Sequence, residues 1–70
     1  MNIDLLTKLR HEINATRRDV SLATGITENQ IYLIESGQSQ NPTLKTISAL
    51  ANFYGVSIAE LVGEQNEGGD

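Results

Sequence analysis

The stretch that most constrains the fold of this chain runs from Thr16 to Gly37 and reads TRRDVSLATGITENQIYLIESG. Thr16 and Thr27 are each followed three positions later by a polar residue. This spacing is typical of a helix N-terminus, where the threonine hydroxyl accepts a hydrogen bond from a free backbone N–H. Gly25 falls between the two threonines, where a sharp turn from one helix into the next needs a positive φ. The stretch therefore predicts two short helices joined by a tight turn.

Four apolar side chains in this stretch fall where two crossed helices would share one core, namely Val20, Ile26, Ile31 and Ile34. Two short helices that cross around a tight turn outline a helix-turn-helix, the unit that places its second helix in the DNA major groove. The stretch therefore predicts a function together with a fold.

The rest of the chain also shows helical spacing. Five helices are expected, over residues 3–13, 17–24, 28–35, 44–54 and 58–62. The apolar positions of the first and fourth helices are Leu5, Leu6, Leu9 and Ile13, and Leu44, Ile47, Leu50, Ala51 and Tyr54, respectively. Ser57 and Glu60 have the spacing of a capping box before the last helix. No segment alternates apolar and polar residues as a strand does, so the predicted fold class is all-α.

The composition excludes several kinds of site. A chain of 70 residues makes one small domain, which buries only about 60 % of its unfolded surface and would gain stability from dimerisation. The absence of cysteine excludes disulfides, thiolate catalysis and cysteine-ligated zinc, and a single histidine, His11, provides no metal cluster, so we expect no cofactor. The sequence shows neither a signal peptide nor a long apolar stretch, which predicts a soluble cytoplasmic protein without membrane contact.

The net charge of −4 is distributed unevenly. Residues 1–59 carry five acidic and five basic side chains, and the four remaining acids are Glu60, Glu64, Glu67 and Asp70. A neutral body can bind DNA, although its counterion release is modest. Residues 64–70 have no apolar anchor, so we expect an acidic disordered tail after a helix-turn-helix domain at residues 1–63, with the motif at 16–37.

Six short sequence features follow one another along the chain. They are Leu9-Arg10, Gly25-Ile26-Thr27, Ile31 with Ile34, Glu35-Ser36-Gly37, Pro42-Thr43-Leu44, and Gly55-Val56-Ser57 with Leu61. Their spacing resembles that of the phage repressor and Cro-type helix-turn-helix domains, also called the xenobiotic-response-element family. The resemblance implies a compact five-helix, lambda-repressor-like DNA-binding domain. The chain departs from the family at Arg17, Ser21 and Tyr54, where glutamine, alanine and leucine are common.

Base reading is assigned to the outward face of the second helix of the motif. With Ile31 and Ile34 turned inward, the outward positions are Glu28, Asn29, Tyr32 and Leu33. Asparagine can bond adenine through two hydrogen bonds, glutamate can accept from cytosine N4, and leucine can pack on a thymine methyl group. The alternative interpretation is a solvated helix face, on which Glu28 interacts favourably with the helix dipole.

The resemblance also implies which side chains contact the DNA backbone. The candidates are Arg17, Arg18, Thr27, Gln38, Gln40, Asn41 and Lys45. Such contacts position a protein without reading sequence, and few of them are charged, which predicts a shallow salt dependence. The alternative is that these side chains are solvated and contact no DNA. In the family, residues matching Arg10 and Glu35 form a partly buried ion pair, so Arg10 is interpreted as structural.

An apolar patch of Phe53, Val56 and Ile58 is a candidate dimer contact, because this end of the domain often meets its twin in the resembled family. A dimer would place two recognition helices about 34 Å apart, over an inverted repeat. Alternatively, Phe53 packs on the first helix.

The sequence leaves two candidate functions open. The first is a sequence-specific regulator of double-stranded DNA, a homodimeric repressor. The second is a protein-interaction module, antitoxin-like or partner-binding, that keeps the fold with weak or no DNA binding. An enzyme is not expected, because the sequence shows no paired acid and base, no phosphate-binding loop and no activated nucleophile.

Overall fold

Five α-helices make up the part of the chain that the computed structural model describes, residues 1–39 and 41–63. They are α1 (Ile3–Glu12), α2 (Arg17–Thr24), α3 (Glu28–Glu35), α4 (Leu44–Tyr54) and α5 (Ile58–Val62), and no strand occurs in these two ranges. The predicted all-α class is confirmed, and the helix bounds agree with the expected ones to within one residue. The expected acidic tail lies outside the described residues.

Local capping explains where the helices begin. Thr16 and Asp19 form a complete capping box at α2, and Ser57 and Glu60 form another at α5. The backbone N–H of Thr16 donates to the Asp19 carboxylate at 2.9 Å. This hydrogen bond, together with a second one from the Thr16 side chain, lowers the pKa of Asp19. The turn after α2 depends on Gly25, which ends that helix at a φ of 81°, in the left-handed region that glycine adopts without strain.

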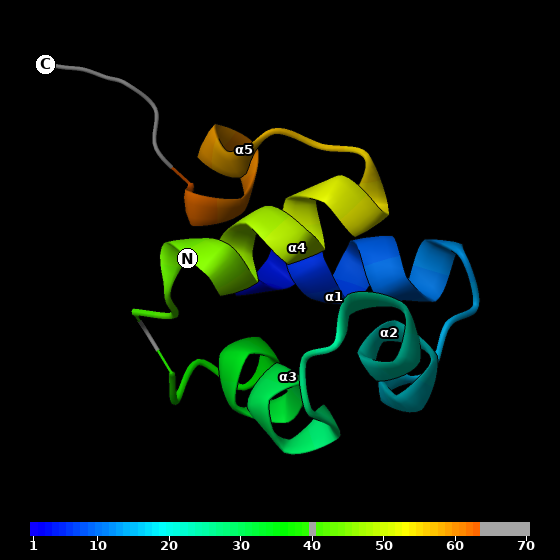
Figure 1. Cartoon of the computed structure of the whole chain (residues 1–70). Coiled ribbons are helices and arrows are strands. Elements are labelled where there is room, and N and C mark those ends of the chain that lie inside the picture. The colour runs from blue at the N-terminus through cyan, green and yellow to red at the C-terminus, as the bar shows by residue number, and fades with distance from the viewer. Residues whose placement is uncertain (40, 64–70) are drawn as a thin grey trace, which may run out of the picture.

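The helices are arranged so that α3 lies on the outside of the molecule. In Figure 1, α4 runs above α3 and α5 covers the other side of α4, while α1 passes behind them. The packing pairs are α1 with α3 and α5, α2 with α3 and α4, and α4 with α5. The start of the chain is also held against α5, because the N–H of Asn2 donates to the carbonyl of Leu61 at 2.7 Å.

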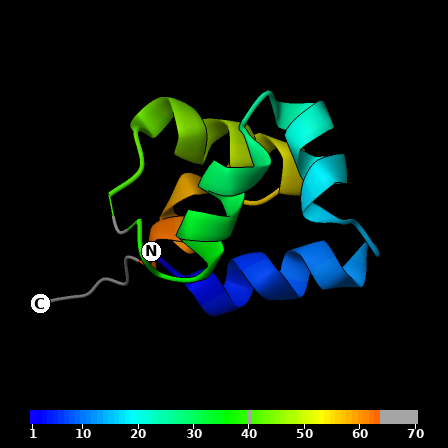
Figure 2. The same cartoon turned by 90° about the horizontal axis from the view of Figure 1, so that it is seen from below.

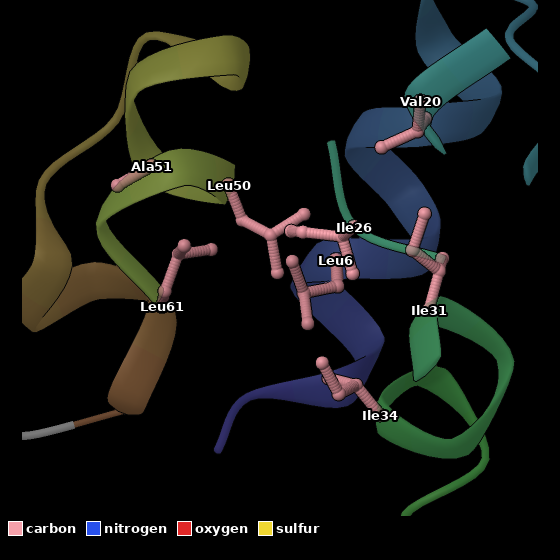
Figure 3. Packing of buried hydrophobic residues seen from close by; sticks show 8 residues of the cluster. All are labelled: Leu6, Val20, Ile26, Ile31, Ile34, Leu50, Ala51 and Leu61. Atoms are coloured by element: carbon pink, nitrogen blue, oxygen red, sulfur yellow. The ribbon is translucent and has the colours of Figure 1, made fainter. Parts of the chain in front are cut away.

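Every helix contributes to one hydrophobic core (Figure 3). Its buried members are Leu6, Val20, Ile26, Ile31, Ile34, Leu50, Ala51 and Leu61. The four apolar residues predicted as the shared core of the motif are all among them. Because α3 contributes both Ile31 and Ile34, one face of that helix is anchored and its opposite face is left to solvent.

Two residues expected at core-facing positions are exposed. Ile13 follows the last residue of α1 as its C-cap, and the chain turns there, with Asn14 at a φ of 58°. Leu44 is the first residue of α4, and the first buried residue of that helix is Thr46, two positions later. In both cases the apolar spacing continues past the end of the packed surface, so the predicted burial was wrong.

None of the helices in residues 1–39 and 41–63 is long and apolar enough to cross a lipid bilayer.

Candidate nucleic-acid interface

The surface formed by α2, the turn and α3 is the candidate interface. Figure 2 looks onto this side of the molecule, with α3 in front and α2 next to it. Val20 and Ile26 are buried from α2 and the turn, and Ile31 and Ile34 are buried from α3. The two helices therefore share a core, and the outer face of α3 is presented as a rigid ridge.

Three of the four predicted base-reading residues lie exposed on this ridge. Glu28 and Asn29 occupy the first turn of α3, and Tyr32 follows one turn later with 45 % of its surface exposed. Leu33 is half-buried instead of turned outward as expected, and its carbonyl accepts a hydrogen bond from Ser39 at 2.9 Å. The chain after α3 thus turns back to the backbone of Leu33.

The carboxylate of Glu28 has a positive neighbour. Arg18 Nη1 lies 4.0 Å from Glu28 Oε2, and both side chains are mostly exposed. A pair of this kind contributes at most about 1 kcal/mol to stability. Its effect at this surface is to offset the negative charge of Glu28.

The predicted phosphate contacts lie on both sides of α3. In Figures 1 and 2, α2 is on one side, and the first turn of α4 with the connection before it is on the other. The exposed candidates on and beside these segments are Arg18, Thr27, Gln38, Asn41 and Lys45. Gln40 lies outside the described residues. Polar groups on both sides of a helix in the major groove can contact the phosphates of both strands.

Arg10 and Glu35 form an ion pair between α1 and the end of α3. Arg10 Nε and Nη2 donate to the two carboxylate oxygens of Glu35 at 2.8 and 3.1 Å, and Nη1 donates to the carbonyl of Ala15 at 3.0 Å. The two side chains are only 11 % and 6 % exposed. The pair fixes the end of α3 relative to α1.

Arg17 belongs to the same network, which the sequence did not indicate. Its Nε donates to Glu35 Oε1 at 3.1 Å, and its guanidinium lies 5.2 Å from the centre of the Tyr32 ring. The side chain remains 42 % exposed. The family resemblance implied only the pair of Glu35 with Arg10. A contact between residues 15 or 18 positions apart leaves no local signal of its own.

A second unpredicted link joins α3 to α4. Gln30 Nε2 donates to the hydroxyl of Thr46 at 3.4 Å, and Thr43 donates to the same oxygen at 3.1 Å. Thr46 is buried, so these bonds satisfy a polar group inside the fold. The link connects the first turn of the ridge with the first turn of α4.

The predicted dimer patch lies over the end of α4 and the start of α5. Phe53 and Val56 are partly buried and pack against the core, while Ile58 is exposed. Phe53 also contacts Tyr54 edge to face, with ring centres 4.9 Å apart. The patch is therefore divided between residues that serve the fold and one that solvent reaches.

Family membership follows from comparison with known proteins. A family model described as helix-turn-helix matches residues 6–61. The chain belongs to the Cro/C1-type helix-turn-helix family. This family comprises DNA-binding transcriptional regulators, and the matched region extends from α1 into α5.

Two regulators are among the similar proteins. The chain is 41 % identical over 56 residues to the cryptic phage CTXphi transcriptional repressor RstR of Vibrio cholerae, covering 80 % of this chain and 50 % of that protein. It is 32 % identical over 60 residues to an uncharacterized HTH-type transcriptional regulator of Coxiella burnetii, covering 86 % of this chain and 28 % of that protein. The chain thus spans half the length or less of these relatives. No solved structure matches it significantly.

An enzyme also contains a similar segment. The match to glutamine–fructose-6-phosphate aminotransferase of Methanocaldococcus jannaschii is 30 % identical over 61 residues and covers 6 % of that protein. Because the match covers so small a share of that protein, the activity in its name is not carried over to this chain.

One tyrosine of this helix-turn-helix domain gives its stability a pH dependence. Burial, together with the nearby Glu35 carboxylate, raises the pKa of Tyr54 to about 12. Tyrosine in the unfolded chain titrates at about pH 10. Since the folded-state pKa is the higher one, this contribution to stability is complete below pH 10 and is lost as the pH rises to 12. We expect Tyr54→Phe to reduce the fall in unfolding free energy between pH 9.5 and 11.5, as measured by urea denaturation. Parallel curves for the variant and the wild type would contradict this assignment.

Proposed function

We propose that the chain is a sequence-specific, double-stranded DNA-binding repressor that acts as a homodimer on an inverted repeat, with α3 in the major groove. The observation that carries the proposal is the ridge on α3. Asn29 and Tyr32 are exposed on one face, while Ile31 and Ile34 fix the opposite face in the core. Side chains held this way can reach base edges without a conformational change, which keeps the entropic cost of binding low.

The charges around the ridge support binding to DNA. The interface presents Arg17, Arg18 and Lys45 on either side of α3, against two exposed carboxylates, Asp19 on α2 and Glu28 on α3. Three positive side chains therefore face two negative ones here, although the chain as a whole is acidic, and Arg18 lies 4.0 Å from Glu28. Few charged contacts release few counterions, so the proposal includes a shallow salt dependence.

Homodimerisation is the part of the proposal that gives the inverted repeat. Ile58 is exposed beside Val56, and both line a shallow depression between the end of α4 and α5. Apolar surface next to a depression of this kind is suited to a two-fold contact, in which each copy offers the same residues. The two copies of α3 would then read half-sites about one helical turn apart.

The deciding experiment is selection of DNA by the purified protein from a random-sequence pool, followed by sequencing. An enriched inverted repeat would support both the DNA function and the dimer, and would give the half-site spacing. A single half-site without a repeat would support DNA reading and reject the dimer. If the folded protein enriches nothing, the DNA function is rejected.

Asn29→Ala and Lys45→Ala are expected to weaken DNA binding in different ways. Loss of the Asn29 amide removes base contacts worth about 1–3 kcal/mol and relaxes the preference at one base pair. Loss of the Lys45 ammonium weakens all sequences alike and reduces the slope of log K against log salt by about 0.9. Titrations of matched and mismatched sites at several salt concentrations measure both effects.

The control for these variants is Lys8→Ala. Lys8 is exposed on α1, and the change removes the same charge outside the proposed interface. If Lys8→Ala and Lys45→Ala reduce the salt slope equally, then Lys45 acts through net charge and not through a phosphate contact.

A protein-interaction module is the second candidate function. It is favoured by Leu22 and Leu44, both exposed on α2 and α4, and by the acidic net charge. Binding to a protein through apolar surface would weaken little with added salt, whereas DNA binding weakens steadily. Measuring the affinity for a protein partner and the affinity for DNA over a series of salt concentrations therefore separates the two functions.

A further inference from the structure

Arg17 connects the buried ion pair to the exposed ridge. It is the first residue of α2, and its Nε donates to Glu35 Oε1 at 3.1 Å. The same guanidinium lies over the Tyr32 ring, 5.2 Å from the ring centre. The side chains of Arg17 and Glu35 are 42 % and 6 % exposed, so the arginine leads from a buried carboxylate to the protein surface.

The position of this guanidinium is determined from inside the fold. Glu35 is itself held by two hydrogen bonds from Arg10, which is anchored in turn on the carbonyl of Ala15. A planar guanidinium whose Nε must point to a fixed oxygen has few orientations left. Its flat face is then available to the ring of Tyr32, through an attraction between the cation and the ring electrons.

We propose that Arg17 is a positioning residue for sequence recognition, which holds the Tyr32 ring in one orientation on the DNA-facing side of α3. This inference rests on the proposed function, because it assigns to Tyr32 a base that α3 reads. It replaces the simpler expectation that Arg17 only contacts a phosphate. Removing the guanidinium plane therefore lowers discrimination at the base pair next to Tyr32, and affinity for unrelated DNA is retained.

Lysine is the substitution that separates positioning from phosphate binding. The Lys ammonium keeps the positive charge and binds phosphate as a point charge, but it has no plane that can pair with Glu35 and stack on Tyr32 together. If Arg17 positions Tyr32, Arg17→Lys fails to replace it. If Arg17 only contacts a phosphate, Arg17→Lys works nearly as well as the wild type.

The first arm of the test needs no DNA. Side-chain NMR couplings report how far the Tyr32 ring is confined to one χ1 rotamer in the wild type and in Arg17→Lys. We expect one dominant rotamer in the wild type and rotamer averaging in the variant. Arg18→Lys is the matched control, since Arg18 is the adjacent arginine and contacts no described aromatic ring. An unchanged Tyr32 rotamer in Arg17→Lys overturns the inference.

The second arm measures discrimination on the sequence that the wild type selects. Tyr32→Leu identifies the base pair that Tyr32 reads, as the position where preference is lost. At that base pair Arg17→Lys is expected to lower discrimination about three- to fivefold, the effect of losing one exposed cation–π contact. It should leave the salt slope unchanged and have no further effect in a Tyr32→Leu background.

The outcomes keep the two proposals apart. If the wild type selects a DNA sequence and Arg17→Lys discriminates as well as the wild type, the positioning role is wrong and the DNA function stands. A reduced salt slope with equal loss on all sequences in Arg17→Gln, and rescue by Arg17→Lys, assigns Arg17 to a phosphate and also overturns the inference. If the wild type selects no sequence, the proposed function fails and the inference fails with it.

Discussion

Replacing Arg10 by alanine is expected to lower the melting temperature of the protein far more than replacing Arg17 does. Arg10 makes three hydrogen bonds from a side chain that is 11 % exposed, two to Glu35 and one to the carbonyl of Ala15. Breaking a buried ion pair by removing one partner costs about 3–5 kcal/mol. In a domain of this size each kcal/mol corresponds to roughly 4–8 °C, so the loss is at least about 12 °C.

Arg17→Ala leaves the Arg10 pair intact and removes a half-exposed contact. Its expected cost is about 0–1 kcal/mol. Thermal unfolding followed by circular dichroism compares the two variants, with Lys8→Ala as the control for loss of an exposed charge on α1. Equal melting temperatures for Arg10→Ala and Arg17→Ala would mean that both arginines stabilise Glu35 equally. That result would contradict the prediction, which rests on the deeper burial of Arg10.

Leu61→Ala is expected to cost about 2–5 kcal/mol, the second large effect in this molecule. Leu61 is fully buried and is the one residue of the five-residue helix α5 in the core cluster. Its carbonyl also accepts the hydrogen bond from Asn2 that holds the start of the chain. Without this side chain α5 loses its main attachment, and the surface around Ile58 loses its support.

The matched control is Leu22→Ala. Leu22 is 74 % exposed on α2, so the same change in side chain removes little buried surface and is expected to stay within about 0.5 kcal/mol. Urea denaturation of both variants gives the comparison. If the two variants unfold at the same urea concentration, α5 does not contribute to the cooperative core.

The fold was predictable because its signals are local. Each of α2 to α5 begins after a threonine or serine that caps it within the next three residues, and Gly25 marks the turn of the motif. Asn2 caps α1 in the same way, because its side chain accepts a hydrogen bond from the backbone N–H of Leu5. Periodicity alone does not tell where the core ends, which is why Ile13 and Leu44 were placed on the wrong side.

The candidate site was only partly predictable. The exposure of Glu28, Asn29 and Tyr32 follows from the inward position of the two isoleucines on the same helix, because residues on one helix have fixed relative directions. The contacts of Arg17 depend on how α2 and α3 cross, and the crossing is set by packing in three dimensions. No spacing along the chain encodes such a contact.

In the proposed function, the ridge on α3 also bears on how the preferred DNA sequence can change over generations. Positions 28 and 29 make no contact with the core, so new side chains there alter recognition at little cost to folding. Position 32 is different, because its ring meets Arg17, which shares Glu35 with the buried Arg10. Variation at positions 28 and 29 is therefore not constrained by the core, although position 28 faces Arg18, whereas positions 17 and 32 are expected to change as a pair.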